Sequence, residues 1–259
     1  MSALAETVTE NVVQNPLAAL REAVAEDLMT LAVMHDRELD GERILALWDI
    51  GFEEFLGLRL LRREGREALG LFHRGLTDIP GVLDQQTLDV LAAEYADIYL
   101  NNSYGASPVE SVWIDEDGLI MQEPMFQVRD WYRRYDLAVP DWRKRTDDHL
   151  VHQLQFLSRL LGPGQPEAPL QEAARFMDEH LLRWVGRFAE RIGQRCSTRF
   201  YAGLALLTAG YLEELRDLLA ELTEEPRPTS EEVEERMKPK LSVQVAGPAP
   251  FVPGAAPSW

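Results

Sequence analysis

The chain has 259 residues, with 26 Lys and Arg against 44 Asp and Glu, so its formal net charge is −18. Affinity for nucleic-acid phosphates and anionic lipid comes from cationic side chains, so this charge argues against both classes of partner. Hydrophobic residues make up 46 %, enough for a packed core, and the single cysteine, Cys196, excludes an internal disulfide or a multi-cysteine zinc site. We expect a globular protein of one or two domains in a reducing compartment.

No secretory or membrane-spanning segment is predicted. The first fifteen residues contain Glu6 and Glu10 but no Lys or Arg, so they lack the basic start of a signal peptide. The longest uncharged apolar stretch, residues 200–212, is shorter than the roughly 20 residues that a transmembrane helix needs. These features predict a cytoplasmic protein without stable membrane insertion.

Apolar residues recur at helical spacing in six segments, the first of which has Pro16 in its opening turn. The six segments cover residues 16–31, 44–55, 88–99, 150–161, 170–192 and 200–222. Gly162, Pro163 and Gly164 end the fourth segment sharply. Only residues 111–121 could be briefly extended. We therefore predict an all-α fold, a single compact bundle of about eight to ten helices.

The last part of the chain has the composition of a tail. Seven of the fifteen prolines fall within residues 226–259, and ten acidic residues lie between Glu213 and Glu235. This composition predicts an all-helical domain over residues 1–225 and an acidic, then Pro-, Ala- and Gly-rich tail over residues 226–259. A short acidic helix, residues 230–237, is expected within the tail.

Motifs of the common enzyme classes are absent: the sequence has no GxxxxGK[ST], GxGxxG, GxSxG or HExxH. One cluster has ligand-type side chains, namely Asp147, Asp148, His149 and His152. Two histidines three residues apart share a helix face, so with Asp148 they could hold the metal of a small helical hydrolase. The alternative is capping, with Thr146 as the N-cap of a helix and the two aspartates in its first turn.

Aromatic residues gather around the two predicted loops, residues 101–108 and 137–149. They are Trp113, Trp131, Tyr132, Tyr135 and Trp142. Most buried aromatics serve core packing. Several of these residues, however, lie beside turn formers and charges, as in a groove for a basic, partly apolar peptide.

Four segments, in the same order, resemble motifs of the TorD/DmsD/NarJ-type chaperones. Residues 147–157 (DDHLVHQLQFL) are similar to the DHxxxELxFL signature, and residues 107–115 (SPVESVWID) to the PxxSVYxD loop. Residues 176–184 (FMDEHLLRW) resemble FxxxHLxxW, and residues 200–205 (FYAGLA) resemble FYxxLA. Three positions depart from these motifs: Thr146, where the family usually has Pro, Gln153, where it usually has Glu, and Val109, where some members have Trp.

The resemblance implies a cytoplasmic, non-catalytic chaperone without a cofactor of its own. Such chaperones bind the twin-arginine signal peptide and the immature catalytic subunit of a molybdopterin enzyme until its cofactor is inserted. Residues 111–126 are most similar to chaperones of dimethyl-sulfide, chlorate, selenate and ethylbenzene enzymes. The expected peptide-binding residues are those of the two central motifs, Asp148, His149, Ser111, Trp113, Pro108 and Asp147.

Two questions stay open at this point. A helical adaptor that works through the acidic segment 213–235 is an alternative to the dedicated chaperone, as is the metal-dependent hydrolase at Asp148, His149 and His152. The chain could be a monomer or a dimer formed by helix swapping. In the chaperone reading Asp148 could accept hydrogen bonds from a guanidinium of the signal peptide, because charge-assisted pairs are strong and directional.

Overall fold

The structure is a computed structural model that describes residues 15–50, 56–163 and 168–238. Over these ranges the chain is helical, without a β-strand; one isolated antiparallel bridge joins Val109 and His149. The helices are α1 (Pro16–Asp36), α2 (Gly41–Ile50), α3 (Arg63–Thr77), α4 (Gln85–Tyr99), α5 (Ser111–Ile114), α6 (Glu123–Arg134), α7 (Leu150–Leu161), α8 (Leu170–Glu179), a 3₁₀ turn (Leu181–Arg183), α9 (Val185–Arg195), α10 (Arg199–Thr223) and α11 (Ser230–Met237). The prediction of an all-α bundle is confirmed. None of these helices is long and apolar enough to cross a membrane.

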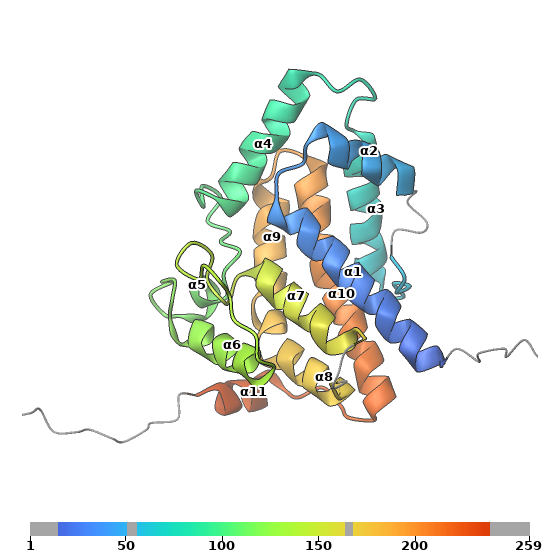
Figure 1. Cartoon of the computed structure of the whole chain (residues 1–259). Coiled ribbons are helices and arrows are strands. Elements are labelled where there is room, and N and C mark those ends of the chain that lie inside the picture. The colour runs from blue at the N-terminus through green and yellow to red at the C-terminus, as the bar shows by residue number, and fades with distance from the viewer. Residues whose placement is uncertain (1–14, 51–55, 164–167, 239–259) are drawn as a thin grey trace, which may run out of the picture.

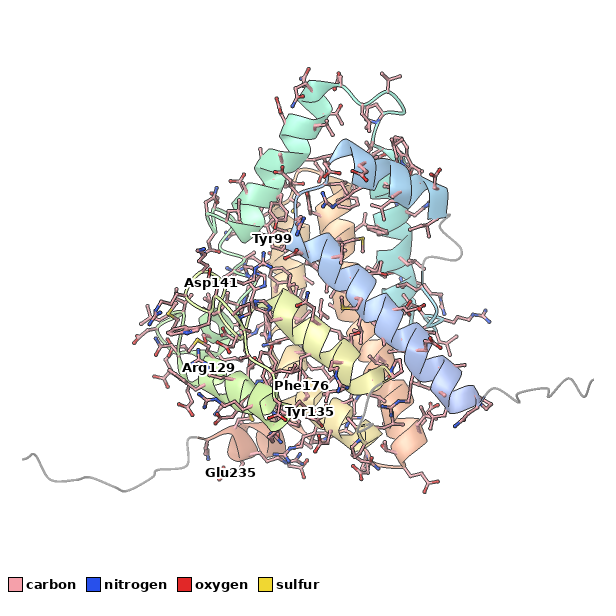
Figure 2. The ribbon with its side chains drawn as sticks, in the orientation of Figure 1. Tyr99, Arg129, Tyr135, Asp141, Phe176 and Glu235 are labelled. Atoms are coloured by element: carbon pink, nitrogen blue, oxygen red, sulfur yellow. The ribbon has the colours of Figure 1, made fainter. Side chains whose placement is uncertain are left out.

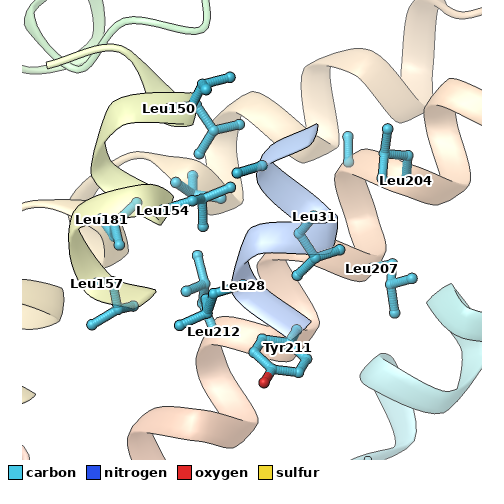
Figure 3. Packing of buried hydrophobic residues seen from close by; sticks show 14 of the residues in the cluster. Leu28, Leu31, Leu150, Leu154, Leu157, Leu181, Leu204, Leu207, Tyr211 and Leu212 are labelled. Atoms are coloured by element: carbon cyan, nitrogen blue, oxygen red, sulfur yellow. The ribbon is translucent and has the colours of Figure 1, made fainter. Parts of the chain in front are cut away.

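The centre of the bundle is α10, which packs against α3, α8 and α9 and also touches α1 (Figure 1). On its other side α1 lies along α7. Leucines of three helices meet between them, among them Leu28 of α1, Leu154 of α7 and Leu207 of α10, all fully buried (Figure 3). Burying a leucine side chain contributes about 2 kcal/mol, so this leucine layer is a main source of stability.

The helices α3 and α10 touch backbone to backbone. A Cβ atom placed on Gly203 would lie 2.5 Å from the Cα atom of Phe72, and one on Gly210 would lie 2.9 Å from the Cα atom of Gly65. No side chain fits at such distances, so only glycine allows this approach. Because Gly65 faces Gly210 and Phe72 faces Gly203, the two helices run antiparallel.

Several predicted helix ends are confirmed. Pro16 lies in the first turn of α1, which Asn15 caps by accepting a hydrogen bond from the Leu17 N–H at 3.1 Å. Gly162 ends α7. The short acidic helix is present as α11, and Thr229 opens it with a capping box.

Two expectations about local structure are wrong. Residues 111–121 are not extended: Ser111 begins α5, and the Asp115 carboxylate then accepts the N–H groups of Asp117 and Leu119, which makes a turn. Residues 170–192 form two helices instead of one. The break falls at His180, whose buried ring bonds to Glu110 at 3.1 Å from another part of the chain, a contact that periodicity does not reveal.

Helix α11 packs onto the bundle below α6 and α8 (Figure 1). Val233 is buried, Gln127 donates to the Met237 carbonyl at 3.0 Å, and Arg183 pairs with Glu234 at 3.0 Å. The division of the chain at residues 225 and 226 stays a prediction, because the residues after 238 lie outside the described ranges. Phe52 and Phe55 of the second predicted segment also lie outside them.

Candidate functional site

The two central motifs meet in one place, where residues 107–111 lie against residues 146–150 at the start of α7. We call this place the loop junction. The Leu150 N–H donates to the Pro108 carbonyl at 2.8 Å, and the Glu110 N–H donates to the Asp148 carbonyl at 3.1 Å. These bonds run between segments about 40 residues apart in the chain, so the junction fixes the central loop on the first turn of α7.

Asp148 lies at the middle of the loop junction and is fully buried. Its Oδ2 atom accepts two hydrogen bonds from Ser111, one from the N–H at 2.8 Å and one from the hydroxyl at 2.5 Å. Its Oδ1 atom has no hydrogen-bond partner in the described part of the chain. The first N–H groups of a helix have no partner within the helix, so Asp148 caps α5 from a distance.

Asp147 is also buried, and it faces α6. Arg129 donates to its two carboxylate oxygens, at 3.2 and 2.8 Å, and the Tyr132 hydroxyl donates to its carbonyl at 2.9 Å. The Arg129 guanidinium lies over the rings of Phe126 and Trp142, at 5.5 and 4.7 Å. The hydrogen bond to Asp147 raises the pKa of Arg129, so the guanidinium stays charged. Asp147 therefore has a partner within the chain.

His149 is the N-cap of α7, and the prediction that Thr146 would take this place is wrong. The Nδ1 atom of His149 accepts the Val151 N–H at 3.2 Å. Thr146 lies one turn earlier, because its carbonyl accepts the His149 N–H at 3.2 Å and the four residues 146–149 make a turn before the helix begins. Burial, with Arg145 and His152 nearby, holds the pKa of His149 well below its ordinary value, which keeps the ring neutral as a cap.

We expect His149→Asn to weaken the pH dependence of stability while leaving α7 capped, since Asn is a preferred N-cap. The unfolded chain protonates His149 near pH 6.5, and the folded chain does so only at much lower pH, so stability falls as the pH drops below about 6.5. Between pH 7.5 and 5.5 the variant should lose about 1 kcal/mol less than the wild type. Urea unfolding at the two pH values measures this difference. Equal losses would mean that His149 is protonated in the fold.

A buried polar network continues from the loop junction and adds Glu110 and His180 to the residues that the motifs predicted. Glu110 is fully buried and accepts hydrogen bonds from Gln153 at 2.6 Å and from His180 at 3.1 Å. Trp184 donates to Gln153 at 3.4 Å, and the Arg183 guanidinium lies 3.7 Å from Glu110. An ionised Glu at position 153 has no proton to donate, so Gln153 fits a site beside another carboxylate. The sequence did carry a signal for this network, because Glu110 lies in the motif of residues 107–115 and His180 in the motif of residues 176–184.

Trp113 is the one residue of the predicted peptide site that is partly exposed; the other five are buried. Its indole N–H donates to the Ser107 carbonyl at 2.8 Å. Arg187 and Arg191 of α9 lie over its ring, at 5.7 and 5.2 Å from the centroid. The structure thus brings all six predicted residues to one place, but it turns most of their polar atoms inward.

Of the predicted aromatic cluster, two members belong to the core. Trp131 and Tyr132 are buried, and both rings pack on Phe156. Tyr135 also contacts Phe156, next to Phe176 of α8 (Tyr135 and Phe176 are labelled in Figure 2). These rings stabilise the contact of α6 with α7 and α8, so core packing accounts for much of the cluster.

Comparison with known proteins matches residues 61–190 to the model of the nitrate reductase delta subunit family. The chain belongs to this family. It is 28 % identical to the chaperone protein TorD of Vibrio cholerae serotype O1 (strain M66-2) over 222 residues, which is 81 % of this chain and 97 % of the relative. It is 26 % identical to TorD of Aliivibrio fischeri over 207 residues, 77 % of this chain and 95 % of the relative. The chain is thus a molybdoenzyme maturation chaperone of the TorD/NarJ type, in a non-catalytic family.

The metal site considered at Asp148, His149 and His152 is not formed, and Cys196 lies at a helix end. Within residues 15–50, 56–163 and 168–238, no three His, Cys, Asp or Glu side chains are close enough to hold a metal ion. His149 and His152 lie 6.1 Å apart between ring centroids, and His149 uses Nδ1 as a cap. Cys196 ends α9, and burial raises the pKa of its thiol, which makes it a poor nucleophile.

Proposed function

We propose that this TorD/NarJ-type chaperone works in the cytoplasm on the immature catalytic subunit of one molybdopterin oxidoreductase. It binds the twin-arginine signal peptide of that subunit and holds the subunit until the cofactor is inserted. One observation carries the proposal: the motif residues shared with this family form a continuous buried unit, in which Asp148 joins Ser111 and Glu110 joins His180.

The chemistry of the chain suits such a client. A twin-arginine signal presents two guanidiniums followed by an apolar segment, and a protein with a net charge of −18 attracts it over a long range. Trp113, which is partly exposed, can touch the client subunit directly. Because Pro108, Ser111, Asp148 and their neighbours are buried, we propose that they act indirectly, by holding the central loop in place against α7.

We expect the full chain to bind a synthetic twin-arginine signal peptide and to bind it at least tenfold more weakly when both arginines are replaced by Gln. The loss follows from removing two charges that the acidic protein attracts. Isothermal titration calorimetry measures both affinities, and raising the salt concentration should reduce the difference between them. Equal affinities for the two peptides would contradict the proposed function.

A further inference from the structure

A large groove lies away from the loop junction, with walls from α3 and α9 and a floor from α10. Figure 1 shows where these three helices lie. Its volume is about 760 Å³. The floor and walls are apolar and mostly small, formed by Ala68 and Leu71 of α3, Ala189 of α9, and Leu206 and Ala209 of α10. A groove with this floor can bury an apolar segment of a partner.

The groove is open at Gly186 because glycine has no side chain that would fill it. Gly186, near the start of α9, is exposed and lines the groove, and a Cβ atom placed on it would meet nothing within 4 Å. Glycine in a helix costs about 1 kcal/mol relative to alanine. At Gly186, therefore, the local helix would be more stable with a side chain, and the packing around it does not require glycine.

The charged groups lining the groove are mainly acidic. They are Glu64, Glu67, Glu190 and Glu213, against Arg62 and Arg74. Arg62 is held by Glu213 at 3.2 Å, and Glu67 is paired with Arg63 at 2.8 Å. Across the described residues no ion pair is recorded for Glu64 or Glu190. These two exposed carboxylates are available to a cationic partner.

Helix α9 contacts the segment around the loop junction with one face and lines the groove with another. Arg187 and Arg191 reach to Trp113 and to the Gly105 carbonyl on one side. Gly186 and Glu190 line the groove on the other. A ligand in the groove would therefore not need to open the buried bonds of Asp148.

We propose that this groove is where the signal peptide binds, an inference that rests on the proposed function. The arginine pair lies between Glu64 and Glu190, and the apolar segment that follows lies over Leu71 and Leu206. Charge complementarity selects this occupant, because the peptide joins two cations to an apolar segment in the same way that the groove joins two free carboxylates to an apolar floor.

Substitutions at Gly186 test this proposal, because a positive and a negative side chain there should affect peptide binding differently. We expect Gly186→Arg to weaken binding at least tenfold, since it fills the groove and repels the arginine pair, and Gly186→Glu to weaken it less than threefold. The probe is a synthetic peptide with two adjacent arginines and an apolar stretch of about 12 residues, within the usual range for a signal peptide. Calorimetry with the full chain measures its affinity, and the thermal midpoint of each variant confirms folding.

The matched controls are Gly81→Arg and Gly81→Glu, because Gly81 is exposed, also has open space around it and does not line the groove. Both should bind within twofold of the wild type. Suppose that the wild type binds the peptide, and that Gly186→Arg and Gly186→Glu change the affinity no more than the two Gly81 variants do. The peptide then does not bind in the groove, and the proposed function stands. If the wild type does not bind the peptide at all, the proposed function itself fails.

Discussion

Gly203→Ala is expected to lower the free energy of unfolding by about 3 kcal/mol, at the upper end of overpacking effects. The added methyl carbon would lie 2.5 Å from the Phe72 backbone. Backbone atoms cannot rotate out of the way as a side chain can. Helices α3 and α10 would have to separate along their whole contact. Urea unfolding followed by circular dichroism measures the change.

The control for this prediction is Gly186→Ala, also in a helix but with open space around it. It should stabilise the chain by up to about 1 kcal/mol, because alanine is the better helix former. A neutral Gly203→Ala together with a stabilising Gly186→Ala would show that α3 and α10 do not touch as described.

Arg216→Met is expected to destabilise the chain by about 3–5 kcal/mol, the usual result of breaking a buried ion pair. Arg216 of α10 is 2 % exposed and donates to both carboxylate oxygens of Asp178 on α8, each at 2.8 Å. Removing the guanidinium leaves the buried Asp178 carboxylate without its counter-ion. Thermal and urea unfolding both report the loss.

The double variant Arg216→Met/Asp178→Leu provides the control. With both charges gone, no buried carboxylate is left alone, and most of the lost stability should return. A double variant as unstable as Arg216→Met alone would mean that packing of the arginine stem, and not its charge, holds α8 on α10.

Local signals in the sequence predicted much of the fold. Pro16 and Gly162 mark helix ends through their own backbone chemistry, and α11 follows from its acidic first turn. The break at His180 depends on Glu110, which lies far away in the chain. Periodicity reports only which face of a helix is apolar, so such a partner cannot be found from it.

In the candidate site, too, local motifs could be predicted from the sequence and distant contacts could not. The motifs predicted Ser111, Trp113 and Asp148 as parts of one site, and the structure joins Asp148 to Ser111, with Trp113 two residues further along α5. Their part in peptide binding stays a prediction. Their burial could not be predicted, because an aspartate that caps a distant helix and one that faces a ligand look alike in sequence. The groove was missed for a related reason: Gly186 and Ala189 are ordinary helix residues until α3 lies beside them.

The contact between α3 and α10 also has a consequence for the order of synthesis. A ribosome makes α3 early, but the residues that cover its glycine face belong to α10, near the end of the described chain. At roughly 5–20 residues per second, α3 waits on the order of ten seconds for its partner. The nascent chaperone thus passes through its own stage with uncovered apolar surface, and completes its core only after Gly210 has left the ribosome.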